Sequence, residues 1–310
     1  MTPAPFYAEV ANGPKGGAAH WLTTSDGLRI RAGHWTGGTK GTILLFPGRT
    51  EYVEKYGRAA TEFLTRGYSV LAVDWRGQGI ADRMLNDRAA GHVHHFPDYQ
   101  KDVSAVLAHA RALGLPEPYH LIGHSMGGCI GLRALYEGLP VKSAMFSAPM
   151  WGIIIAPALR PFAWMSSWTA RRVGQGHRLA PGTEPVTYVM STPFDDNTLT
   201  TDRAMFDYMK AQLSAHPDLA LGGPSLHWLN EALMEMRRLA ARHAPATPAI
   251  TFLGSNERIV EPSRIHDRMA DYPNGKLVML DGAEHEVMME TPAIRTRVFN
   301  ETTAWFDAHS

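Results

Sequence analysis

The 310-residue sequence has one cysteine, Cys129, and no excess of charge of either sign. A single cysteine excludes an internal disulfide, and its place at the start of a predicted buried helix favours an inert packing thiol. Thirty basic residues balance thirty acidic ones. The charge balance therefore gives no support to a nucleic acid as a partner.

Long hydrophobic runs are also missing. The most apolar window, MWGIIIAPALRPFAWMSSW at residues 150–168, is interrupted by Pro157, Arg160 and Pro161, and falls short of the roughly 20 residues of a membrane-spanning helix. We interpret it as a lid or pocket wall that can touch a membrane peripherally. The opening MTPAPFYAEVANG has no basic region followed by an apolar run, so a cytoplasmic protein is expected.

Short apolar runs alternate with helical patterns along much of the chain. After an opening hairpin, HWLTTSDGLRIRAGHW, come the strand-like runs GTILLFPG, YSVLAVDW, YHLIGHS and VKSAMFSAP, with helical patterns at about 52–66, 98–113 and 126–138. Such alternation is typical of a mostly parallel sheet with crossover helices. The predicted class is therefore α/β, with a twisted sheet flanked by helices.

The alternation stops after residue 147 and resumes with PAITFLGS and GKLVMLDG. The sequence between is helical in pattern and carries several prolines and tryptophans. We therefore expect a core formed by residues 1–147 and 246–310, with a helical cap inserted at 148–245.

The stretch YHLIGHSMGGCIGL contains the pattern G-x-S-x-G around Ser125, between a predicted strand and a predicted helix. A tight strand-to-helix turn exposes a serine hydroxyl at the positive end of a helix, and the glycines give it room. The turn alone also fits a glycine-rich connection with a capping serine. A histidine base and a carboxylate elsewhere in the chain would favour a nucleophilic serine over a structural turn.

A serine nucleophile needs a histidine base that is oriented by a carboxylate. His285, in the sequence LDGAEHEVMME after the last predicted strand, is the candidate base. No Asp or Glu occurs at 148–183, so the acid is expected after PAITFLG, where Glu257 is preferred and Glu261 is the alternative. Backbone N–H groups of Met126 and Arg49 are the expected donors to an oxyanion.

Two further groups, three tryptophans and three histidines, each allow two interpretations. Trp151, Trp164 and Trp168 either bind the acyl chain of a substrate or pack the cap onto its own core. His92, His94 and His95 suggest a metal site, but no ordered carboxylate or cysteine spacing accompanies them, so a structural loop is expected and no metal is predicted.

These motifs together resemble the α/β-hydrolase superfamily, in particular the branch of bacterial lysophospholipases and monoacylglycerol lipases. FPGRTEYVEKY is similar to that branch's H-G-x-x-E-H/Y loop, VDWRGQGIADR to its D-x-R-G-x-G-x-S signature, and GAEHE to its histidine loop. The chain departs from the branch at Pro47, Ala81 and Glu257, which replace the usual His, Ser and Asp.

The resemblance implies a serine hydrolase without a cofactor that cleaves carboxylic esters through an acyl-enzyme, with a lysophospholipid or monoacylglycerol as the expected substrate. A small-ester carboxylesterase is the main alternative. A peptidase would need a cap carboxylate for the substrate amine, for which Glu184, Asp195 and Asp196 are candidates. A non-enzymatic binding protein on this fold would be expected to lack part of the triad. The oligomeric state stays open.

Overall fold

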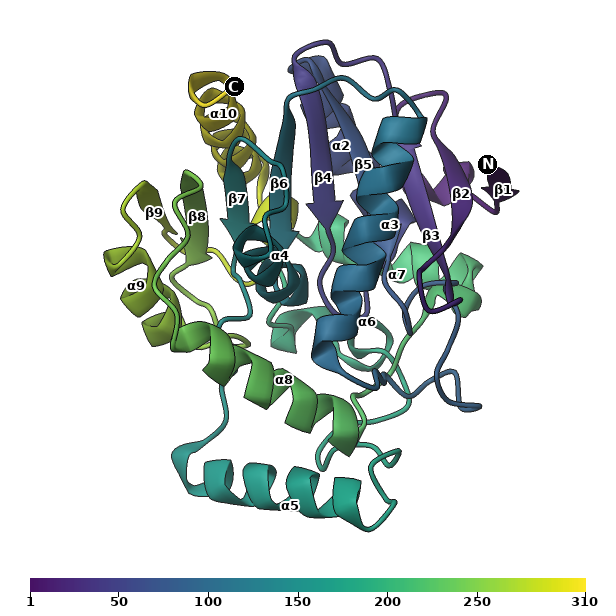
Figure 1. Ribbon diagram of the computed structural model, residues 1–310, viewed down its shortest axis with the longest axis vertical. Helices are drawn as coiled ribbons and strands as arrows, with labels where there is room; N and C mark the ends of the chain where they lie inside the picture. Colours follow the sequence, from purple (N-terminus) through teal and green to yellow (C-terminus); the bar gives the residue numbers. More distant parts are fainter.

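A nine-stranded sheet runs through the protein, whose computed structural model describes residues 1–310 (Figure 1). Its order is β1-β2-β3-β5-β4-β6-β7-β8-β9; the pairs from β1 to β5 are antiparallel and the pairs from β5 to β9 are parallel. This confirms the predicted α/β class and the opening hairpin. The strands are β1 Thr2–Ala4, β2 Ala18–Thr23, β3 Arg29–Trp35, β4 Gly41–Phe46, β5 Tyr68–Asp74, β6 Tyr119–His124, β7 Ala144–Ser147, β8 Ala249–Gly254 and β9 Gly275–Leu280.

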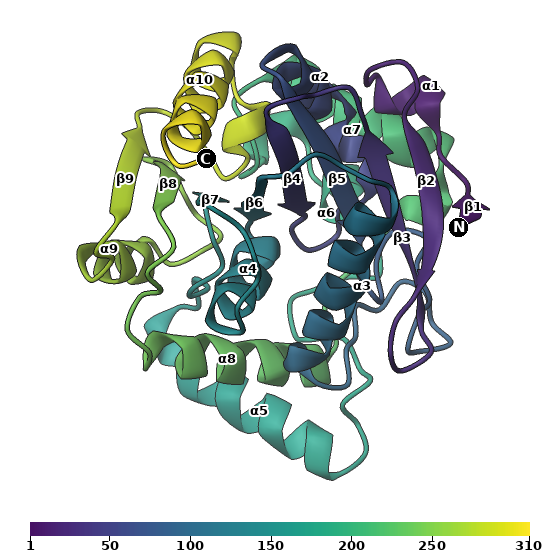
Figure 2. The same cartoon turned by 45° about the horizontal axis from the view of Figure 1, so that its top comes forward.

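Helices cover both faces of the sheet (Figure 2). α3 (Tyr99–Ala112), α4 (Met126–Tyr136) and α9 (Pro262–Ala270) bury their apolar residues against one face, and α2 (Gly57–Thr65) and α10 (Pro292–Ala308) against the other. Strands β4, β5, β6 and β8 are buried along their whole length. Burial on both faces explains why these strands read as continuous apolar runs in the sequence.

No strand of the sheet lies between β7 and β8. This stretch forms α5 (Arg160–Arg172), α6 (Tyr188–Ser191), α7 (Arg203–Ala215) and α8 (Leu226–Ala240). Two of these helices begin at side-chain caps: Asp202 accepts from Met205 N–H, and Ser225 accepts from Trp228 N–H. α5 lies on the far side of α8 from the sheet (Figures 1 and 2). The function of residues 148–245 as a cap stays a prediction.

The strand order places several loops at one edge. From β4 the chain forms β5 on one side and later β6 on the other, so the carboxyl ends of β4 and β6 open at a topological switch point, where ligands bind in open α/β sheets. Phe46 and Gly123 are paired at the ends of these strands. The loop after Phe46 therefore starts beside Ser125, and the loops after β8 and β9 end at the same edge.

Candidate active site

Ser125 lies at a sharp turn between β6 and α4. Its backbone has φ 48° and ψ −117°, a region that L-residues rarely adopt. A side chain at Gly127 would collide with the carbonyl oxygen of Phe46, so only glycine fits two residues after the serine. The strained turn expected from G-x-S-x-G is therefore present, and it leaves the Ser125 side chain in the wall of a cavity.

His285 and Glu257 form a buried pair. Nδ1 of His285 lies 2.8 Å from Oε2 of Glu257. The other carboxylate oxygen accepts hydrogen bonds from the backbone N–H groups of Ile259 (2.7 Å) and Val260 (3.0 Å). Burial favours the protonated acid, but the His285 ring and these N–H groups outweigh it and lower the pKa of Glu257. Glu257 is thus held as a carboxylate that faces the imidazole.

The cavity at this sheet edge has a volume of about 350 Å³, and both Ser125 and His285 line it. No hydrogen bond joins the two side chains; such contacts often tighten only when substrate binds. Most of the wall is apolar or aromatic: Tyr52, Met150, Ile153, Tyr188, Val189, Leu199, Met209, Leu213, Trp228, Ile259 and Val260. An apolar pocket of this size with a few polar groups is typical of a small-molecule site.

The backbone N–H groups of Arg49 and Met126 have no hydrogen-bond partner within the protein. Two hydrogen bonds fix the loop before Arg49. Trp75 donates to the carbonyl of Pro47 and Gln78 donates to that of Gly48, both at 3.0 Å. With its carbonyls fixed in this way, the loop keeps a free donor beside the turn at Ser125. Two free N–H groups near one serine are what an oxyanion requires.

Charged side chains that sequence reasoning missed lie behind this loop. Glu51 accepts from Gly48 N–H and Tyr56 O–H, and the ammonium of Lys55 contacts the carboxylates of both Glu51 and Glu286. His124, directly before Ser125, places Nε2 3.3 Å from Glu286 and 3.5 Å from Glu51. We call Glu51, Lys55, His124 and Glu286 the buried ion cluster. All four residues are at most 4% exposed.

The surroundings of His124 favour its protonated, positively charged form. Nδ1 lies 3.1 Å from the carbonyl oxygen of Ser147, which can only accept, and Nε2 faces two carboxylates without the alignment of a hydrogen bond. Burial lowers the pKa of His124, but Glu286 and Glu51 outweigh this effect and raise it. A protonated His124 makes the cluster neutral, with two cations against two carboxylates. Neutrality matters because an uncompensated buried charge is costly.

Glu51, His124 and Glu286 also offer ligand atoms within 4.8 Å of one another, as a metal site would. The ammonium of Lys55 contacts both carboxylates of that set. The buried ion cluster thus has a cation of its own between its acids, and its geometry fits an ion-pair network better than a metal centre.

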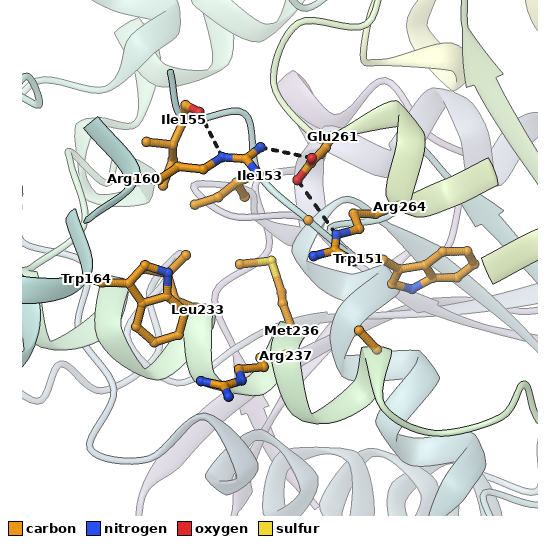
Figure 3. A pocket seen from close by; sticks show the side chains of 12 residues that line it. Trp151, Ile153, Ile155, Arg160, Trp164, Leu233, Met236, Arg237, Glu261 and Arg264 are labelled. Carbon is orange, nitrogen blue, oxygen red and sulfur yellow. Dashed lines mark hydrogen bonds and ion pairs between the residues drawn. The ribbon is translucent and has the colours of Figure 1, made fainter. Parts of the chain in front are cut away.

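The three tryptophans, for which an acyl pocket and packing of the cap were both considered, lie outside the cavity of Ser125. Trp151 is buried and donates to the carbonyl of Gly128 at 3.2 Å. With Trp164 it lines a second cavity beside α8 (Figure 3), and Trp168 is half exposed on α5. None of the three lines the cavity of Ser125, where Trp228 of α8 is the tryptophan. Ile153 alone belongs to the walls of both cavities.

The alternative acids do not line the cavity of Ser125 either. Glu261 lies in the second cavity, where it accepts from Arg160 at 2.9 Å and faces Arg264 (Figure 3). Glu184, Asp195 and Asp196, considered for a substrate amine, are also outside the Ser125 cavity.

In the loop that contains His92, His94 and His95, the side chain of His92 is hydrogen-bonded to that of Ser225 at 2.8 Å.

The Arg49 side chain lines the Ser125 cavity. It donates to the carbonyl of Gly222 at 2.6 Å and lies 5.3 Å over the ring of Trp228, and no carboxylate pairs with it. Burial lowers the pKa of its guanidinium to about 10, so it stays positive at neutral pH. A cation without a counter-charge is therefore part of the site.

Comparisons with known proteins agree with this architecture. Residues 37–292 match the family described as serine aminopeptidase, S33. The chain is 30% identical to lysophospholipase L2 of Escherichia coli K12 over 303 residues, which covers 91% of this chain and 84% of that protein. It also resembles the structure of a soluble variant of monoglyceride lipase from Saccharomyces cerevisiae, with a TM-score of 0.71, 23% identity and coverage of 93% and 94%. A carboxyl esterase from Bacillus coagulans has a TM-score of 0.74 at 14% identity, with coverage of 96% and 99%.

Proposed function

The chain belongs to the serine aminopeptidase S33 family of α/β-hydrolases, and on this premise we propose that it hydrolyses the carboxylic ester of lipids with a single acyl chain. The observation that carries the proposal is the His285–Glu257 pair, held at 2.8 Å in the apolar cavity that also contains Ser125. The lysophospholipase relative supports a lipid substrate, and so does the apolar wall of the cavity.

In the proposed reaction, the hydroxyl oxygen of Ser125 attacks the ester carbonyl while His285 takes its proton. Glu257 keeps the proton-bearing Nδ1 of His285 in place and stabilises the imidazolium. The N–H groups of Arg49 and Met126 bind the negative oxygen of the tetrahedral intermediate. His285 then protonates the leaving alcohol, and a water molecule, activated by the same imidazole, releases the fatty acid from the serine.

The guanidinium of Arg49 supports an anionic head group. It is the one positive group in this wall that has no carboxylate partner, since Lys55 and His124 are neutralised within the buried ion cluster. A phosphate bound by arginine gains charge-assisted hydrogen bonds, which a neutral glycerol ester does not offer. A lysophospholipid therefore fits the cavity better than a monoacylglycerol.

An apolar surface on the cap supports contact with a membrane. Leu159, Phe162, Met165, Trp168 and Val173, which we call the α5 surface, are each at least half exposed. Arg172 lies over Trp168, and no acidic residue occurs from 148 to 183. Exposed aromatic and aliphatic residues beside arginines are typical of helices that lie in a lipid interface. No helix of the protein has the length and hydropathy of a membrane span. The expected cytoplasmic location stays a prediction.

A peptidase is less well supported than an esterase. An aminopeptidase needs an acid that faces the substrate amine, and the carboxylates in this cavity wall, Glu51 and Glu286, are both neutralised by Lys55 and His124. Hydrolysis of aminoacyl p-nitroanilides at rates comparable to those of esters would reverse this order of preference.

Hydrolysis of lysophosphatidylcholine and of the monoacylglycerol with the same acyl chain tests the proposal. We expect activity on both and a higher kcat/KM for the phospholipid. Arg49→Met should lower that preference about tenfold, because one charge-assisted contact is lost. Arg238→Met, an exposed arginine outside the cavity, is the control. No ester hydrolysis by the wild type would refute the function; an unchanged preference in Arg49→Met would refute only the role of Arg49.

A further inference from the structure

A group of three histidines lies away from the active site, on elements that the proposed reaction does not use. His20 comes from β2, His34 from β3 and His109 from α3, and each offers a ring nitrogen within 4.8 Å of the other two. His34 and His109 are at most 8% exposed, and His20 is half-buried. No local motif in the sequence marks the group, because its members are up to 89 positions apart.

The fold explains why the three side chains meet. In the antiparallel pair β2–β3, His34 faces Ala18 and His20 faces Ala32, so the two histidines are diagonal neighbours on one face of the sheet. α3 lies beside these strands in both views (Figures 1 and 2). The ring centroid of His109 is 5.0 Å from that of His20 and 6.3 Å from that of His34. The group therefore joins the opening hairpin to α3.

Each ring also leaves a nitrogen without a partner. Nδ1 of His20, Nδ1 of His34 and Nε2 of His109 are buried and make no hydrogen bond within the protein. Three unsatisfied buried nitrogens in one cluster are unusual, because native proteins pair nearly all buried polar groups. No carboxylate or other acceptor lies in the cluster to pair with a protonated ring, so an additional partner is needed.

The close packing of the rings favours a metal ion over protons as that partner. A neutral imidazole binds metal through the lone pair of its unprotonated nitrogen, so one ion can be shared by three rings. Protons cannot satisfy all three rings, because three close imidazolium ions would repel one another.

We propose that His20, His34 and His109 bind a divalent transition metal, with Zn²⁺ as the reference ion. Imidazole nitrogens prefer zinc, copper and nickel over magnesium or calcium, which favour oxygen ligands. Zinc holds such nitrogens at about 2.0–2.1 Å, and hence about 3.4 Å apart in a tetrahedral site. The ligand nitrogens lie within 4.8 Å of one another, and the rings of His20 and His34 are stacked at an interplanar angle of 6°, so metal binding requires these side chains to turn toward a common point. His20, which is partly exposed, leaves room for a water as fourth ligand.

The site differs from a permanent structural zinc site in one respect. Ligating histidines usually donate their second N–H to a carboxylate or carbonyl, and such partners are worth about 10- to 100-fold in affinity. None of these three rings makes a side-chain hydrogen bond to another residue. We therefore expect reversible binding, in the micromolar range, that clamps the hairpin to α3.

Thermal unfolding of the EDTA-treated full chain, with and without ZnCl₂, tests the proposal independently of activity. Zinc at a hundredfold excess over its Kd should raise Tm by about 4 °C for a chain of this length. Titration calorimetry should give one ion per chain. His34→Ala and His109→Ala should weaken binding at least about tenfold, while His243→Ala and His94→Ala, which remove exposed histidines outside the group, should not.

Folding is checked separately by the Tm of each variant in EDTA. If either buried variant fails to fold, His20→Asn, which alters the most exposed of the three histidines, replaces it and should also weaken zinc binding. X-ray absorption of the zinc complex should show three imidazole ligands. No effect of zinc on Tm or heat, or equal loss of binding in His243→Ala, would overturn the proposal. Loss of ester hydrolysis would not bear on it.

Discussion

Nε2 of His124 lies 3.3 Å from a carboxylate oxygen of Glu286. His124 directly precedes the proposed nucleophile and Glu286 directly follows the proposed base, so this ion pair ties the two loops together next to their functional residues. Glu51 extends the connection to the loop after β4 through Gly48 N–H. Three separate loops are thus held in register by one neutral group of buried charges. The proposed chemistry depends on this register, because the reacting atoms must meet within hydrogen-bond distance.

Replacing Ser125 by alanine should lower kcat for ester hydrolysis by about four powers of ten or more, since the nucleophile is lost and only binding and the oxyanion donors remain. The fold should be kept, because the change removes one oxygen atom. Stopped ester assays on the purified variant, with circular dichroism as the folding check, measure both. A variant with a tenth of wild-type activity would show that another residue is the nucleophile.

Glu257→Gln should reduce kcat by about 10²–10⁴-fold, since the amide cannot stabilise the imidazolium. Glu261→Gln should have little effect, because that side chain pairs with Arg160 and Arg264 in the second cavity. The two variants are matched controls for each other in size and charge. Equal losses in both would contradict the assignment of the acid.

His124→Gln should destabilise the protein most at low pH. The folded-state pKa of His124 is raised, so its charged ring contributes stability that is complete below about 6.5, its unfolded value, and lost as pH rises through the folded pKa. Glu51, Glu286 and Lys55 surround this ring, and the two carboxylates raise its pKa against burial and the charge of Lys55; the ring of His285 also faces it at 4.9 Å. The difference in unfolding free energy between wild type and variant, measured in urea, should therefore shrink from pH 6 to pH 9. His243→Gln should give no such trend, and a difference independent of pH would mean that His124 is neutral.

The ester preference should rise with acyl length. Each buried methylene is worth about 0.8 kcal/mol, or up to about fourfold in kcat/KM, until the apolar wall is filled. p-Nitrophenyl esters from acetate to dodecanoate measure this series. Activity that peaks at acetate or butyrate would favour a small-ester carboxylesterase and leave the triad assignment untouched.

Sedimentation with vesicles should show that the protein binds lipid through the α5 surface. Phe162→Ser and Trp168→Ser should weaken binding to vesicles that contain anionic lipid, because two exposed apolar anchors are removed. Met279→Ser removes an exposed apolar side chain on β9 and should leave binding unchanged. Equal binding by all three variants would rule out the α5 surface as the contact.

Local patterns in the sequence were enough to predict the sheet and the sharp turn at Ser125, because strand periodicity and the glycines around the turn are short-range signals. The catalytic roles of Ser125, Glu257 and His285 stay predictions. The place of the tryptophans stayed open in the sequence, because an apolar residue looks the same whether it packs the cap or faces a cavity. Trp228 and Arg49 meet in the cavity only through the folded arrangement of α8 and the loop after β4. The pairing of Lys55 with Glu286 spans 231 positions and has no local signature.

Every group assigned to bond making comes from the sheet core, whereas α6, α7 and α8 supply only walls. Yet the segment before α7 is fastened to the histidine loop: the N–H of Glu286 donates to the carbonyl of Leu199 at 2.7 Å, and that of His285 to Thr198 at 3.4 Å. An exchange of caps between relatives could therefore change substrate choice without altering the chemistry, provided that this two-residue backbone anchor is transplanted intact. A chimera that breaks it would lose the alignment of its base even though no catalytic side chain had been replaced.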